Sequence, residues 1–202
     1  MKLYYAPGTC ALASHIVLAE TKLPFTAIRV DLREKKFNDG SEYLKVNPKG
    51  YVPALELADG KVITEGPVIL QYIADQAPSA NLTPAAGTFE RIRMHEWLTF
   101  VSSEIHKTYS PMFDKTLDAG TREKNVEKLK KRYAFVEETL AKQPFLAGPL
   151  FGIADAYLFT VTRWAESMKV DLSAFPAIRS FMERVGSRDS VKTALADEGI
   201  KN

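Results

Sequence analysis

Strand-forming sequence is confined to the first part of this 202-residue chain, and this restricts the fold more than any other feature. Four short β-branched or aromatic runs read as strands, at 3–5, 25–30, 53–57 and 61–63. Helical patterns follow Cys10 and Pro67, and the polar stretch 31–46 is expected to hold a loop and a short helix. Residues 1–77 are therefore predicted to form an α/β domain in the order βαβαββα.

The chain changes character at 78–88, a linker by its Pro, Ala, Gly and Ser content. Beyond it the strand signal disappears and apolar residues recur at helical spacing, first along 94–105 and then along 126–140. Residues 153–168 are apolar nearly all round, which predicts a central buried helix, and two shorter helices are expected after Pro176 and Arg188. Residues 89–202 are therefore predicted to form an all-α helical domain.

Composition narrows the class of function. A net charge of +2 favours neither nucleic acid nor an anionic membrane surface as a partner, and no apolar run approaches the ~18 residues of a membrane span. One cysteine excludes an internal disulfide framework, so the cytoplasm is the expected compartment. Three scattered histidines and that cysteine lack the spacing of metal ligands, so no metal site is expected.

The single cysteine, Cys10, is placed where the first strand runs into the first helix. Unpaired N–H groups and the positive end of the helix dipole favour thiolate there, whereas composition alone favours a small buried apolar residue. A thiol opening the first helix of this layout resembles a thioredoxin-like domain, but Ala13 stands where a dithiol enzyme has its second cysteine. Cys10 would therefore work with an external thiol, and glutathione is the most abundant one in cytoplasm.

Two further segments suit a small peptide ligand. Pro53 favours an extended Val52, whose N–H and C=O could pair with a peptide backbone. Pro67 suits the first helical position, with Gly66 then at the N-cap. Free N–H groups there would bind a carboxylate, and Glu65 could pair with an ammonium. An ordinary acidic residue near a helix start is an equally good interpretation of Glu65.

Together these segments resemble the cysteine-containing beta class of bacterial glutathione transferases, from residue 1 to about 199. The resemblance is carried by Cys10 after Pro7-Gly8, by Val52-Pro53 and Glu65-Gly66, and by the segment 154–160. It implies a homodimeric detoxification enzyme whose glutathione thiolate attacks small hydrophobic electrophiles, with glutathione as co-substrate and no other cofactor. The alternative is a non-catalytic binding or regulatory protein on the same fold.

The resemblance also implies roles in the first domain. The peptide bond before Pro53 would be cis and would present Val52 to the glutathione cysteinyl group, while Lys35 would reach the glycyl carboxylate. Two roles stay open for Cys10. It could donate a hydrogen bond to the glutathione sulfur, or form a mixed disulfide with it and give glutaredoxin-like reductase activity.

In the second domain the resemblance brings His106 to the sulfur site as a second catalytic residue. Ser103 and Glu104 would contact glutathione held by the partner subunit. Thr99 stands where close relatives typically carry asparagine, and its hydroxyl would bind glutathione in place of the amide. Thr99, Ser103 and His106 are spaced i, i+4, i+7, which predicts one polar helix face. Four nearby side chains are expected to wall the electrophile pocket: Tyr109, Met112, Phe113 and Trp164.

The start of the buried helix at 153 departs from the family pattern. Gly152 replaces the usual Ser or Thr of a capping box, at an expected cost of a few tenths of a kcal/mol. Asp155 is expected to be a structural carboxylate at the helix start rather than a catalytic one.

Overall fold

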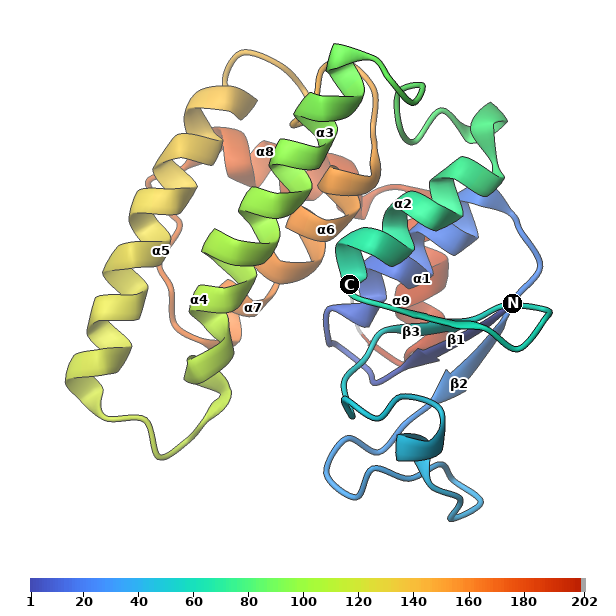
Figure 1. The fold of residues 1–202 in the computed structure, drawn as a ribbon. Helices are drawn as coiled ribbons and strands as arrows, with labels where there is room; N and C mark the ends of the chain where they lie inside the picture. The colour runs from blue at the N-terminus through green and yellow to red at the C-terminus, as the bar shows by residue number, and fades with distance from the viewer. Residues whose placement is uncertain (201–202) are drawn as a thin grey trace. The chain divides into compact units, whose positions relative to one another are not determined.

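The structure is a computed structural model that describes residues 1–200, which fall into two compact units (Figure 1). The first unit comprises Met1–Asn81 and the segment that begins at Ser187, and the second comprises Leu82–Gly186. Each unit has its own buried core and is described by itself.

The first unit is built on a four-stranded mixed sheet in the order β2-β1-β3-β4. Its strands are β1 (Lys2–Tyr5), β2 (Thr26–Arg29), β3 (Ala54–Glu56) and β4 (Val62–Thr64). β1 pairs parallel to β2, with Tyr4 opposite Ile28, and antiparallel to β3, with Tyr4 opposite Ala54. Because β1 is central and its side chains from Leu3 to Tyr5 are buried, its C-terminal end is well fixed where the chain turns toward Cys10.

Helices α1 (Ala11–Thr21) and α2 (Gly66–Gln76) pack against each other and on this sheet. The helix expected within 31–46 is a single 3₁₀ turn, η1 (Tyr43–Lys45). Asp31 Oδ1 accepts hydrogen bonds from the N–H groups of Arg33 and Glu34, so the side chain supplies a turn in place of helical bonds. Another 3₁₀ turn, η2 (Pro78–Ala80), follows α2.

The last helix, α9 (Asp189–Asp197), packs on α1 and belongs to the first unit. The sequence predicted a helical second domain over 89–202, and this assignment is wrong for the segment after Gly186. The physical reason is a pairing between residues far apart in sequence, because Arg188 and Ser190 both bond to the carboxylate of Glu20 on α1. A helical pattern alone cannot say against which unit a helix packs.

The second unit is helical. Its elements are α3 (Phe89–Phe100), the π-helical turn η3 (Val101–His106), α4 (Lys107–Tyr109), the 3₁₀ turn η4 (Ser110–Phe113), α5 (Ala119–Leu140), α6 (Ile153–Thr162), α7 (Trp164–Ser167) and α8 (Pro176–Gly186). Every residue of α6 is buried, and α3, η3, α7 and α8 all contact it. This confirms the predicted central helix over 153–162, but the predicted range continued to 168, where the structure has a separate short helix, α7. The predicted apolar stripes of α3 and α5 are also buried, as at Leu98 and Tyr133.

Within residues 1–200, the structure contains no helix that combines the length and the apolar character needed to cross a membrane.

Candidate functional site

Cys10 occupies the N-cap of α1, at the end of the loop that leaves β1. Thr9 braces this loop, since its hydroxyl donates to the Ala6 carbonyl at 2.8 Å and accepts from the N–H of Ala11 at 3.4 Å. The Cys10 thiol donates to the Val52 carbonyl at 3.3 Å. The thiol and the backbone before Pro53, which are 42 residues apart in sequence, are therefore in direct contact, as the proposed peptide site requires.

The surroundings of Cys10 favour the protonated thiol. The pKa of Cys10 rises from 9.0 to about 12, chiefly because the half-buried sulfur is poorly solvated and, to a smaller degree, because the Glu65 charge lies nearby. The backbone N–H groups of Cys10 and Ala11 lower the pKa, as the helix N-terminus predicts, but they do not outweigh burial. The sequence-based prediction of a favoured thiolate is wrong.

The segment before Pro53 is held rigidly. The Val52–Pro53 peptide bond is cis, which confirms what the family resemblance implies. The Tyr51 carbonyl accepts hydrogen bonds from the Tyr43 hydroxyl at 2.7 Å and the Asn47 amide at 2.8 Å. Val52 itself is buried, so its backbone position depends on these fixed neighbours.

The start of α2 differs by one residue from the predicted arrangement. Glu65, not Gly66, is the N-cap, and its φ of 70° is uncommon for a residue with a side chain. Residues other than glycine with a positive φ are kept only where the surrounding structure compensates the strain, and they cluster at ligand sites. The Glu65 carboxylate pairs with Lys49 at 2.6 Å and is largely exposed, and a Cβ added to Gly66 would meet nothing within 4 Å. Open space therefore adjoins the helix N-terminus.

Lys35 also has a positive φ, 56°, and its ammonium donates to the Gly50 carbonyl at 2.8 Å. An ammonium carries three donors, so two remain for a ligand carboxylate. The Lys35 nitrogen lies 5.9 Å from the centre of the Tyr51 ring, which is exposed.

In the second unit, the π-helical turn η3 rearranges the predicted polar face. The N–H of Lys107 donates to the carbonyl of Ser102, five residues back, so this turn holds one more residue than an α-helical turn. Thr99 and Ser103 line one exposed hollow of about 420 Å³, but His106 does not. The prediction that all three residues share a face is wrong for His106, because the additional residue rotates it away.

His106 instead contacts aromatic residues of α6 and α7. Its Nδ1 lies 2.6 Å from the Tyr157 hydroxyl, and its ring meets the Trp164 ring edge-on with 5.0 Å between centroids. Burial, with a smaller contribution from the Lys107 charge, lowers the pKa of His106 from 6.5 to about 4. The imidazole is therefore neutral near pH 7. Tyr157 was missed from the sequence because it sits in a helix that is apolar on every side.

The other predicted residues of the second unit have mixed placements. Glu104 pairs with Arg132 at 2.7 Å, so it is tied to α5. Of the predicted electrophile wall, Tyr109 and Met112 are core residues with exposed fractions of 0% and 2%, and this part of the prediction is wrong. Phe113 is half-exposed and packs on Trp164 with ring centroids 5.2 Å apart.

Asp155 is structural, as expected: it is buried and accepts from the N–H groups of Gly152 at 2.9 Å and Leu146 at 2.8 Å. His15 is fully buried, and its Nδ1 lies 3.1 Å from Oε1 of Glu198. Among residues 1–200 no group of three or more His, Cys, Asp or Glu side chains is arranged to hold a metal ion.

Comparison with known proteins defines the class of this fold and site. Residues 8–76 match the glutathione S-transferase N-terminal domain, and residues 94–189 match the glutathione S-transferase C-terminal domain. The chain belongs to the glutathione S-transferase family. It is a glutathione transferase of the bacterial beta-class type, since a solved beta class structure from Sphingomonas chungbukensis has a TM-score of 0.96 at 40% identity, with 100% of both chains covered.

Particular relatives are similar along their whole length. Glutathione S-transferase GstA of Escherichia coli O157:H7 is 42% identical over 201 residues, covering 100% of each chain. Glutathione S-transferase GST-4.5 of Xanthomonas campestris pv. campestris is 38% identical, covering 99% of this chain and 100% of the relative. The solved structure of a sphingomonad glutathione S-transferase complexed with glutathione has a TM-score of 0.96 at 39% identity, with 100% of both chains covered.

Proposed function

We propose that this enzyme binds glutathione in the first unit and conjugates it to small apolar electrophiles, with Cys10 acting as a hydrogen-bond donor rather than a nucleophile. The observation that carries this proposal is the position of the Cys10 thiol, which donates to the Val52 carbonyl at 3.3 Å, and the burial that raises the pKa of Cys10 supports it. A thiol that keeps its proton near pH 7 can donate to a glutathione thiolate when its single S–H turns from the Val52 carbonyl to the ligand. It is poorly suited to attack a disulfide, because the thiolate is the nucleophile.

Glutathione would be held at three points in the first unit. The backbone of Val52, just before β3, would pair with the cysteinyl group, so that the ligand binds as one extended residue. Gly66 and Glu65 at the start of α2 bind the carboxylate and the ammonium of the γ-glutamyl group. Lys35 binds the glycyl carboxylate with its remaining donors.

The electrophile would pack on Phe113, whose ring contacts that of the buried Trp164 with centroids 5.2 Å apart. Phe113 is exposed enough to meet a ligand. The Trp164 ring, which contacts Phe113, also contacts the ring of His106. The role of His106 at the sulfur comes from the family resemblance. Since its pKa is about 4, it would contribute a hydrogen bond rather than a positive charge.

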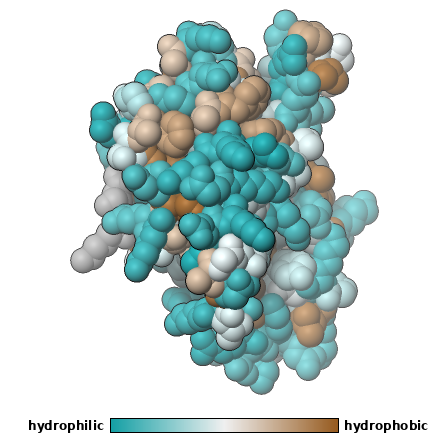
Figure 2. Space-filling model, turned by 90° about the vertical axis from the view of Figure 1, so that its left-hand side faces the viewer, coloured by the Kyte–Doolittle hydropathy of each residue, from teal (hydrophilic) through white to brown (hydrophobic). Residues whose placement is uncertain are grey.

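A homodimer would use the outer aromatic cluster of the second unit, formed by Trp97, Phe100 and Phe135. These rings contact one another with centroids 5.3 to 5.7 Å apart, although Phe135 is 51% exposed. The side of the molecule that carries α5 is otherwise largely hydrophilic, with apolar side chains in small groups (Figure 2). Ser103 and Glu104 would then face glutathione of the partner subunit, as the family resemblance implies.

Three versions of the enzyme test the role of Cys10 with glutathione and an aryl halide. Cys10→Ala should lower kcat/KM about ten- to hundred-fold, since a hydrogen bond to a charged group contributes ~1.5–3 kcal/mol. Cys10→Ser keeps a donor and should recover activity to within a few-fold. Equal loss in both variants, together with loss of a glutathionyl adduct and of disulfide reduction, would establish Cys10 as a nucleophile instead.

A further inference from the structure

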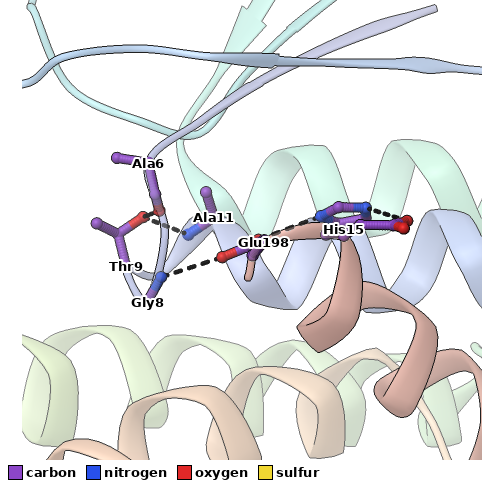
Figure 3. A network of polar contacts seen from close by, with 7 residues as sticks. Ala6, Gly8, Thr9, Ala11, His15 and Glu198 are labelled. Atoms are coloured by element: carbon purple, nitrogen blue, oxygen red, sulfur yellow. Dashed lines mark hydrogen bonds and ion pairs between the residues drawn. The ribbon is translucent and has the colours of Figure 1, made fainter. Parts of the chain in front are cut away.

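The C-terminal segment reaches the loop that carries Cys10. Oε2 of Glu198 accepts a hydrogen bond from the Gly8 N–H at 3.0 Å, and its Oε1 lies 3.1 Å from Nδ1 of His15 (Figure 3). One carboxylate therefore joins the Cys10 loop to the body of α1, across 190 residues of sequence.

Two features fix the position of Glu198. It is the C-cap of α9, which ends in a Schellman turn: the N–H of Ile200 donates to Leu195, that of Gly199 donates to Ala196, and Gly199 has a φ of 69°. This turn folds Ile200 back, so that its Cδ1 lies 3.9 Å from the place where a Cβ of Gly8 would be.

The environment of this carboxylate is closed. The side chains of His15 and Glu198 are both fully buried, and the rings of Tyr5 and Phe25 flank His15. A buried carboxylate that loses its hydrogen bonds destabilises the folded protein, so the bond from Gly8 and the bond to His15 both hold Glu198 in place. Gly8, which donates its N–H to the carboxylate, has a φ of 73° and precedes Cys10 by two residues.

We infer that Glu198 is a positioning residue for Cys10: it fixes the Cys10 loop from the C-terminal end of the chain and thereby sets how the thiol is presented. It acts through Gly8 and His15 and touches neither the thiol nor a ligand. The inference deepens the proposed function, because the consequence for glutathione depends on Cys10 lying at the glutathione site.

The test compares Glu198→Ala and Glu198→Gln with Asp189→Asn, a control on the same helix whose side chain is fully exposed. Glu198→Ala should change the Cys10 alkylation rate by iodoacetamide about ten-fold, the equivalent of one lost hydrogen bond to a charged group, and remove exchange protection of the Gly8 amide. Glu198→Gln can still accept from Gly8 and donate to Nδ1 of His15, and should restore most of both. Asp189→Asn should change neither.

The outcomes separate the two proposals. Alkylation and amide exchange are measured without glutathione, so they test the positioning role even if the conjugation reaction is not observed. If Glu198→Ala proves too unstable, Glu198→Gln at low temperature still shows whether Gly8 protection and thiol reactivity change together. An unchanged alkylation rate in a folded Glu198→Ala protein, or equal changes in Asp189→Asn, would overturn the inference.

Discussion

Replacing Gly152 with serine should destabilise this protein, although serine is the better helix cap in isolation. Gly152 is the N-cap of α6 in an extended conformation that other residues can adopt, with φ −140°. A Cβ at this position would lie 2.7 Å from Cε of Met94 and 2.9 Å from the backbone oxygen of Leu82. The methionine end can move, but the Leu82 oxygen accepts the N–H of Ile153 at 3.0 Å and cannot retreat without weakening that bond.

The magnitudes decide the sign of the change. A serine cap gains only a few tenths of a kcal/mol over glycine, whereas forcing an additional group into a packed site costs about 1–3 kcal/mol. Gly152→Ser should therefore lose about 1–2 kcal/mol of unfolding free energy, and Gly152→Ala slightly more because it brings the same Cβ without a capping oxygen. For a chain of this size the loss lowers Tm by about 2–8 °C.

Thermal and urea unfolding measure these effects, with Gly120→Ala as the matched control. Gly120 lies in the first turn of α5, where an added Cβ meets only Asp118 Oδ1 at 3.4 Å. The control should gain about 0.5–1 kcal/mol, since alanine is the better helix former. A Gly152→Ser protein as stable as the wild type would refute the reasoning, because it would mean that the site relaxes at no cost.

Three further predictions concern titration and assembly. Because Cys10 has a raised pKa of about 12, its alkylation rate should climb with pH through 9 without a plateau, and a plateau below pH 8 would contradict this. The contribution of its protonated form to stability, present below about pH 9, should be lost as pH rises toward 12. The pKa of His106 is lowered to about 4, so the stability that its neutral form contributes above pH 6.5 should be lost as pH falls through 4. An NMR titration of the His106 ring with a midpoint near pH 6.5 would show that the ring is not desolvated. Phe135→Lys should give a monomer in sedimentation, while Leu150→Lys, at another exposed apolar residue, should not; a Phe135→Lys dimer would place the interface elsewhere.

The fold was largely predictable because its signals are periodic. The stripe of α3 and α5 and the wholly apolar α6 each identify a buried helix face, and the four strands have the residues that strands prefer. The packing partner of α9 was not predictable, since the bonds of Glu20 to Arg188 and Ser190 join residues 168 and 170 positions apart. No local pattern encodes such a pairing.

The cis bond before Pro53 was predictable from the family resemblance, but the geometry of the candidate site in the second unit was not. The spacing of Thr99, Ser103 and His106 does not reveal the π-helical turn at 101–106. This turn holds one more residue than an α-helical turn, so it rotates His106 around the helix axis by about the angle between two successive residues. The close approach of Leu82 to Gly152 is equally invisible from the sequence, so a departure from the family pattern that looks like a lost cap is in fact a requirement of packing.

The error over Cys10 has a general physical cause. The helix dipole and its free N–H groups are worth ~0.3–1 kcal/mol, less than the ~1.4 kcal/mol that a tenfold change in ionisation requires. Desolvation can exceed this several-fold, so a helix N-terminus makes a thiolate only where the sulfur stays well hydrated or meets a cation. Neither condition holds here, because the sulfur is half-buried and the charge that acts on it most is the negative one of Glu65. In the proposed site, a protonated Cys10 would also avoid placing a second anion beside a glutathione thiolate. The same burial that makes this thiol a poor nucleophile would then make it a suitable donor to that thiolate.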